Sequence, residues 1–207
     1  MADWGEDKPK IVALPPKKVE PSFPFVWVSD AVLRLDTKPI IKGLLDPGAF
    51  GLVYGPSGSG KSFFSADVAQ HVATGALWRG RKVTQGTVIY VASEAGSSIL
   101  KRFVGWRENR LGESAARVPL AILTRGPNLV DGGTDPDKFE EQMQAIAKEA
   151  ELPISLVIFD TLSRSMPGGD ENKAEDMTKV IECADRLRDK FNCATIFVHH
   201  SGKNIDA

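Results

Sequence analysis

A glycine-rich stretch, GPSGSGKS, contains residue types that together can hold a row of phosphates. In the pattern Gly-x-x-x-x-Gly-Lys-Ser/Thr, glycines let backbone N–H groups point inward at phosphate oxygens. The Lys61 ammonium would reach the β- and γ-phosphates, and the Ser62 hydroxyl is placed to bind magnesium. The predicted contacts are Gly55, Pro56, Ser57, Gly58, Ser59, Gly60, Lys61, Ser62 and Phe63. This stretch predicts a site for a nucleotide, which we expect to be ATP, with Mg²⁺.

Two carboxylates occur at the ends of apolar runs, and they could supply the metal binding and the acid–base chemistry that such a site requires. Asp160 ends the run LVIFD, where it can hold magnesium directly or through water. Glu94 follows the run in VIYVASEAG, where it can orient or deprotonate a water that attacks the γ-phosphate. The alternatives are a turn residue for Asp160 and a solvated loop carboxylate for Glu94.

The run TIFVHHSGK ends in two adjacent histidines, His199 and His200. Neighbouring strand residues point to opposite faces and no third ligand is apparent, so we do not expect a zinc site. One histidine is expected to face the nucleotide and the other to pack or cap a loop. The pattern does not favour either one.

Three basic residues are candidate contacts to phosphate or DNA: Arg102, Arg164 and Lys203. Solvent-facing cations are the alternative for each.

These residues need strands and helices to bring them together, and the pattern supplies both. Apolar runs predict strands at residues 50–54, 88–92, 120–124, 156–159 and 194–198. Helical patterns cover residues 61–74, 97–109, 137–150 and 174–191. The last carries an apolar stripe of Met177, Val180, Ile181, Ala184, Leu187 and Phe191. This alternation predicts an α/β fold, with a mostly parallel sheet covered by helices on both faces.

The composition limits further the class of protein that this sequence can encode. The chain has 207 residues, 42% hydrophobic, and a net charge of -1, which suits one α/β domain and gives no global attraction to nucleic acid. Cys183 and Cys193 fit neither a metal motif nor a disulfide framework. No run has transmembrane length and no signal-peptide core is present, so we expect a cytoplasmic protein without membrane contact.

Residues 1–24 differ from the remainder, with five prolines, four lysines and no sustained periodicity. Such a segment buries too little apolar surface to offset its ordering entropy, so we expect a flexible tail. The catalytic domain is expected to occupy residues 25–207.

The order and spacing of these motifs resemble the RecA-like hexameric replicative DNA helicases, and most closely the plasmid and phage RepA-type helicases. The resemblance runs from about residue 40 to 203. Its segments are IIKGLL, GPSGSGKS, YVASEAG, LVIFDTLSRSMPGGDEN and FVHHSGK. The glycine-rich motif is shared by all P-loop proteins, whereas the last two segments are more specific.

That resemblance implies a RecA-like P-loop fold, a homohexamer and movement along single-stranded DNA. It implies that Glu94 is the catalytic base and Asp160 the magnesium-side carboxylate. His199 or His200 would sense the γ-phosphate, and Arg164 and Lys203 would lie in loops that line the DNA channel. A RecA-like core normally continues past its sensor strand, so we expect residues 25–207 to lack the last strands and an intersubunit arginine.

Two other functions fit the same motifs. One is a RecA-like ATPase without unwinding activity, in which nucleotide state switches DNA or protein binding. The other is a small-molecule P-loop kinase, which requires an acceptor pocket and an arginine-bearing lid. The kinase reading leaves Glu94 and the histidine pair unexplained.

Overall fold

The computed structural model describes residues 26–30, 38–94, 96–111, 117–132 and 134–201. The expected tail at residues 1–24 and the candidate contact Lys203 lie outside these ranges. By its contacts the chain divides into two units, Met1–Asp36 and Thr37–Ala207. In the first unit, Val28–Asp30 form a 3₁₀ turn, η1, in which the Asp30 N–H donates to the Trp27 carbonyl at 2.9 Å.

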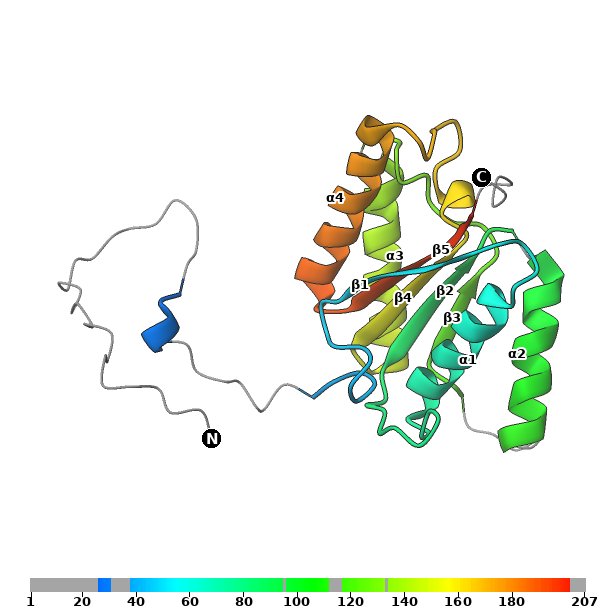
Figure 1. Cartoon of the computed structure of the whole chain (residues 1–207). Helices are drawn as coiled ribbons and strands as arrows, with labels where there is room; N and C mark the ends of the chain where they lie inside the picture. The colour runs from blue at the N-terminus through cyan, green and yellow to red at the C-terminus, as the bar shows by residue number, and fades with distance from the viewer. Residues whose placement is uncertain (1–25, 31–37, 95, 112–116, 133, 202–207) are drawn as a thin grey trace, which may run out of the picture. The chain divides into compact units, whose positions relative to one another are not determined.

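In the described residues of the second unit, five parallel strands form a sheet in the order β1-β5-β4-β2-β3 (Figure 1). The strands are β1 (Phe50–Gly55), β2 (Thr87–Ala92), β3 (Leu120–Leu123), β4 (Ile154–Asp160) and β5 (Ala194–His200). Every strand predicted from an apolar run is therefore present, and the predicted parallel sheet is confirmed.

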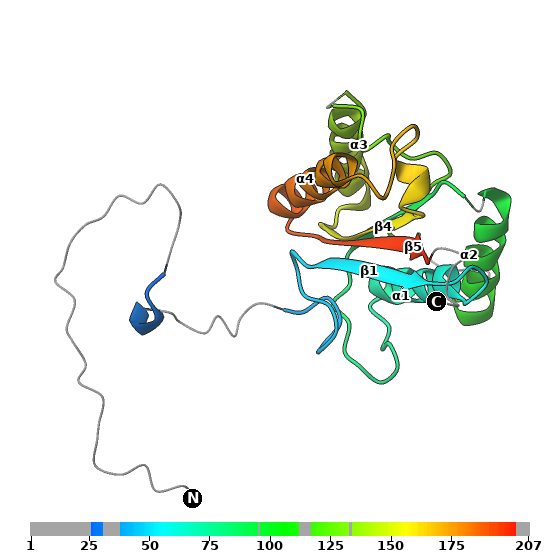
Figure 2. The same ribbon diagram turned by 45° about the horizontal axis from the view of Figure 1, so that its top comes forward.

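Four helices among the described residues cover the two faces of this sheet, as expected: α1 (Lys61–Thr74), α2 (Gly96–Leu111), α3 (Thr134–Ala150) and α4 (Ala174–Phe191). Helices α1 and α2 lie on one face, and α3 and α4 lie on the other (Figures 1 and 2). The largest shift from the expected ends is at α3, which begins at Thr134 rather than at residue 137. None of the described helices is both long and apolar enough to cross a membrane.

Each face of the sheet has its own apolar core, which explains the uninterrupted apolar runs. Along β2, Val88 and Tyr90 pack with α1 and α2, whereas Ile89 and Val91 pack with α3 and α4. Because both faces are covered, all six residues of β2 are buried. Central strands of this kind hold the residues at their carboxyl ends in fixed positions.

The apolar stripe predicted on α4 needs one correction. Ile181 is 44% exposed, and Cys183 is buried in its place. Residues spaced by three or four share a helix face, so Val180, Cys183 and Leu187 point to the sheet together. Ile181 follows Val180 directly and is turned about 100° away from it.

Leu187→Ala should therefore lower the free energy of unfolding by about 2–5 kcal/mol, since Leu187 is fully buried and its truncation leaves a cavity. Ile181→Ala, on the exposed side of the same helix, should change it by less than about 1 kcal/mol. Urea unfolding followed by circular dichroism measures both. Equal losses of unfolding free energy in the two variants would contradict the packing described for α4.

Candidate nucleotide site

The phosphate-binding motif forms the turn between β1 and α1. Strand β1 ends at Gly55 and α1 begins at Lys61. Gly58 and Gly60 adopt φ angles of 79° and 86°, which are strained for a residue with a side chain. The glycines therefore allow the loop to turn tightly onto the start of α1, where backbone N–H groups lack helical acceptors and attract anions.

Lys61 is buried under this loop. Its Nζ donates to the carbonyl oxygens of Gly55 at 2.9 Å and Pro56 at 2.7 Å. The same Nζ lies 3.1 Å from Nδ1 of His200. An ammonium group has three donors and no acceptor, so Nδ1 of His200 must accept this hydrogen bond.

Glu94 is joined to Lys61 through His200. Nε2 of His200 lies 3.4 Å from Oε2 of Glu94. Since Nδ1 accepts from Lys61, a neutral His200 ring carries its proton on Nε2 and donates it to Glu94. The three side chains thus form a continuous series from the P-loop to the end of β2.

His199 points to the other face of the sheet. Its Nδ1 lies 3.5 Å from Oε2 of Glu171, and its ring centroid lies 5.4 Å from that of Tyr54. The structure therefore places His200 beside the P-loop and keeps His199 away from it.

Asp160 is 2% exposed at the end of β4. The hydroxyl of Tyr90, a residue that the sequence analysis did not select, donates to Asp160 Oδ2 at 2.7 Å. Burial, and then the adjacent carboxylate, raise the pKa of Tyr90 far above its ordinary value, so the phenol remains a donor. A tyrosine inside an otherwise apolar strand was the available signal, because a buried hydroxyl requires a partner.

A cavity of about 260 Å³ brings these elements together, and we call it the nucleotide pocket. Arg102, from α2, forms part of its wall and holds its guanidinium 3.9 Å from the centre of the Phe63 ring. The lining residues are Ser57, Gly58, Gly60, Lys61, Ser62, Phe63, Glu94, Arg102, Asp160 and His200. Of the predicted contacts outside the P-loop, Arg102, Glu94, Asp160 and His200 therefore converge here.

A wider cavity of about 540 Å³ adjoins the nucleotide pocket, and Glu94 and His200 line both. We call this second cavity the basic cleft, because Arg125 and Arg164 contribute its cationic side chains. It is lined by Ser93, Glu94, Thr124, Arg125, Gly126, Thr161, Ser163, Arg164, Pro167 and His200. Arg125 was not selected from the sequence, where it follows an apolar run without any recognisable motif.

The donor set in the nucleotide pocket fits magnesium. Within the described ranges, no group of three or more His, Cys, Asp or Glu side chains is placed to hold a metal ion. Magnesium does not require one, since it is usually held by one or two protein oxygens together with phosphates and water. Ser62 and Asp160 supply one hydroxyl and one carboxylate in the pocket.

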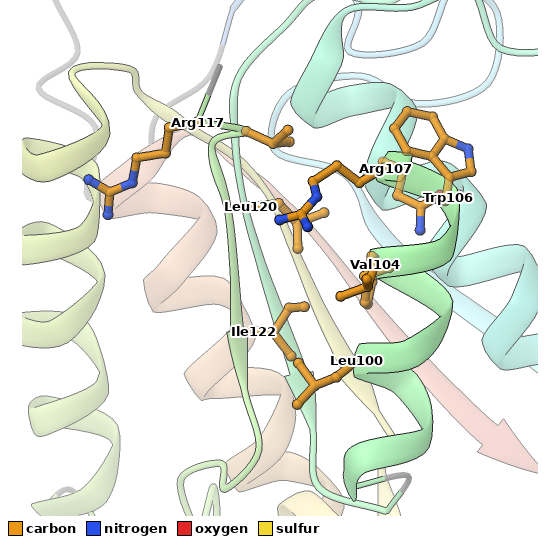
Figure 3. Close-up of a pocket in the computed structure, with 10 residues that line it drawn as sticks. Leu100, Val104, Trp106, Arg107, Arg117, Leu120 and Ile122 are labelled. Carbon is orange, nitrogen blue, oxygen red and sulfur yellow. The ribbon is translucent and has the colours of Figure 1, made fainter. Parts of the chain in front are cut away.

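A third cavity, of about 360 Å³, lies between α2 and β3 (Figure 3). Leu100 and Val104 of α2 face Leu120 and Ile122 of β3, with Arg107 nearby. Its walls are mainly apolar, and none of its lining residues belongs to the P-loop or carries a carboxylate. It therefore lacks the P-loop and the carboxylates that a site for magnesium-dependent nucleotide hydrolysis requires.

Comparison with known proteins agrees with this fold. A family model described as an AAA domain matches residues 17–206. The chain belongs to this AAA domain family. It is also similar in fold to the crystal structure of a KaiC-like protein from the hyperthermophilic archaeon Pyrococcus horikoshii OT3, with a TM-score of 0.50 and 16% identity. The match covers 81% of this chain and 68% of that one. No curated protein sequence matches.

The AAA domain thus has a RecA-like P-loop fold with its phosphate loop formed. Lys61→Ala should weaken binding of a labelled ATP analogue about 10–100-fold, because a charge-assisted hydrogen bond contributes about 1.5–3 kcal/mol. Lys101→Ala is the matched control, since Lys101 is exposed on α2 and does not line the nucleotide pocket. Equal losses of affinity in a fluorescence titration would show that Lys61 does not contact the phosphates.

Proposed function

We propose that this AAA domain is the ATP-hydrolysing motor domain of a hexameric replicative helicase that translocates on single-stranded DNA. The observation that carries the proposal is the series Lys61–His200–Glu94, with contacts of 3.1 and 3.4 Å. This series joins the nucleotide pocket to the basic cleft. A motor requires such a connection between the hydrolysis site and its track.

Hydrolysis would proceed by attack of water on the γ-phosphate of ATP. Backbone N–H groups of the P-loop and the Lys61 ammonium hold the phosphates, and Arg102 adds positive charge at the wall of the pocket. Glu94 is exposed at the end of β2 and orients the water or accepts its proton. Ser62 and Asp160 would hold the magnesium, which would supply positive charge against the phosphates.

Glu94→Gln should reduce ATP turnover about 10²–10⁴-fold, as expected for loss of a general base. Nucleotide affinity should remain near that of the wild type, because Lys61 and the P-loop are unchanged. Phosphate release and a binding titration separate the two effects. Glu108→Gln, on α2 outside the nucleotide pocket, is the matched control. Wild-type turnover in Glu94→Gln would remove Glu94 from the mechanism.

Single-stranded DNA is proposed to bind through its phosphates at the basic cleft. Arg125 and Arg164 are both exposed there, and neither guanidinium forms an ion pair or hydrogen bond with a described residue. Unpaired guanidinium groups bind phosphate oxygens well. His200 lies between the cleft and Lys61, so it is the proposed sensor that connects γ-phosphate to DNA.

The double variant Arg125→Ala/Arg164→Ala should bind single-stranded DNA more weakly than the wild type in the presence of a non-hydrolysable ATP analogue. The slope of log affinity against log salt should fall by about 1.4, since each phosphate contact on a single strand contributes about 0.7. Fluorescence anisotropy measures both quantities. Lys138→Ala/Lys148→Ala, on the exposed side of α3, removes the same charge elsewhere. Equal effects of the two double variants would indicate general electrostatics rather than a DNA site.

The homohexamer rests on the resemblance to helicases and is tested by mass in solution with nucleotide and DNA. Strand displacement separates a helicase from a RecA-like ATPase that only switches its binding. The basic cleft also has room for a small acceptor, which is the feature that a kinase would require. Phosphate release without a phosphorylated acceptor would exclude the kinase.

A further inference from the structure

The hydrogen bond between Tyr90 and Asp160 links two adjacent strands at the nucleotide pocket. In the parallel register of β2 and β4, Tyr90 pairs with Ile158 and Ala92 pairs with Asp160. Side chains two positions apart share a face of the sheet, so Asp160 lies on the same face as Ile158. The long phenol of Tyr90 reaches along this face to Asp160 Oδ2, at 2.7 Å.

The tyrosine ring is held firmly in this orientation. Its residue is 0% exposed, and its ring meets Phe103 of α2 edge-to-face, with centroids 5.2 Å apart. A ring packed in this way has little freedom to turn its hydroxyl away from Asp160. The donor is therefore fixed by the core rather than by the pocket.

Asp160 has two oxygens, and Tyr90 occupies one of them. Among the described residues no donor is hydrogen-bonded to Oδ1, and Asp160 lines the nucleotide pocket. A carboxylate anchored through Oδ2 cannot rotate freely, so it offers Oδ1 to the pocket in one orientation. Outer partners of this kind orient metal-ligating carboxylates and change metal affinity.

We propose that Tyr90 is a positioning residue that holds Asp160 as a one-oxygen ligand for the magnesium of the bound nucleotide. This inference rests on the proposed nucleotide hydrolysis, and it does not depend on DNA or on a hexamer. A phenylalanine would fill the same space without burying a polar group. The hydroxyl therefore has a role beyond packing, and that role is exerted through Asp160.

The first test compares nucleotide affinity with and without metal. A fluorescent ADP analogue is titrated into wild-type protein and into Tyr90→Phe, in excess Mg²⁺ and in excess EDTA. In EDTA the two proteins should bind equally, because the P-loop is intact. The gain in affinity is the ratio of the affinity in Mg²⁺ to the affinity in EDTA. This ratio should be about 10-fold smaller in Tyr90→Phe than in the wild type, as for other outer partners of metal ligands.

Thr87→Val is the matched control. Thr87 lies at the other end of β2, is fully buried, and donates its hydroxyl to the Leu152 carbonyl at 2.9 Å. This variant also removes one buried hydroxyl hydrogen bond from β2, but at the end of the strand that is distant from the Asp160 carboxylate. Its gain in affinity with Mg²⁺ should equal that of the wild type. A smaller gain in Thr87→Val would mean that any loosening of β2 gives the effect, and would overturn the proposal.

A spectroscopic test leaves the tyrosine in place. The chain has two tyrosines, Tyr54 and Tyr90, so 3-fluorotyrosine labelling gives two ¹⁹F signals and Tyr54→Phe identifies the one from Tyr90. With ADP bound, adding Mg²⁺ in place of EDTA should shift the Tyr90 signal. The shift should disappear in Asp160→Asn. A Tyr90 signal that does not respond to Mg²⁺ would overturn the proposal even if Tyr90→Phe failed to fold.

The outcomes also separate this inference from the proposed function. If the wild-type protein gains no affinity from Mg²⁺, the magnesium nucleotide site itself fails. If the wild-type protein gains affinity and Tyr90→Phe gains as much, only the role of Tyr90 fails. Equal losses in Mg²⁺ and in EDTA would make Tyr90 a general structural residue, which also contradicts the proposal.

Discussion

The parallel direction of all five strands is the constraint on which the site depends. Their carboxyl ends meet at a single edge of the sheet, so residues far apart in the sequence reach one location. The P-loop follows β1, Glu94 follows β2, Arg125 follows β3, and Asp160 and His200 end β4 and β5. An antiparallel pairing of any one of these strands would send its residues to the opposite edge.

The sequence predicted this convergence because the central strands are apolar on both faces. β2, β4 and β5 are mainly apolar along their central residues, which indicates burial between two helical layers. For the same reason, the sequence could not predict whether His199 or His200 faces the nucleotide. Phe197 and Val198 are both buried, one on each face, so no polar alternation in β5 marks the side that faces α1. That side is decided by packing, and only the structure reveals that it is His200 that lies beside Lys61.

Tyr90 and Arg125 show a different limit of sequence reasoning. Neither belongs to a motif with fixed spacing, and each acquires its importance from a residue on another strand. Tyr90 reaches Asp160 across a separation of 70 residues, and Arg125 shares a cleft with Arg164. Ile181 shows the converse, since an apolar residue close to a helical stripe was assigned to the core although its angle around α4 turns it outward. Composition and spacing predict elements well, but pairwise contacts between elements depend on register.

The hydrogen bonds of Lys61 explain how phosphate and Glu94 would be linked. The ammonium has three donors, and the carbonyls of Gly55 and Pro56 and Nδ1 of His200 supply three acceptors. A γ-phosphate that Lys61 contacts must therefore replace at least one of them. Two are main-chain oxygens fixed by the turn between β1 and α1, whereas the imidazole can rotate about its side-chain bonds. Under the proposed function, His200 would be the partner that yields, and its movement would change the hydrogen bond to Glu94 at the same time. The residue proposed to orient the attacking water would then be released or turned by the arrival of the phosphate to be attacked.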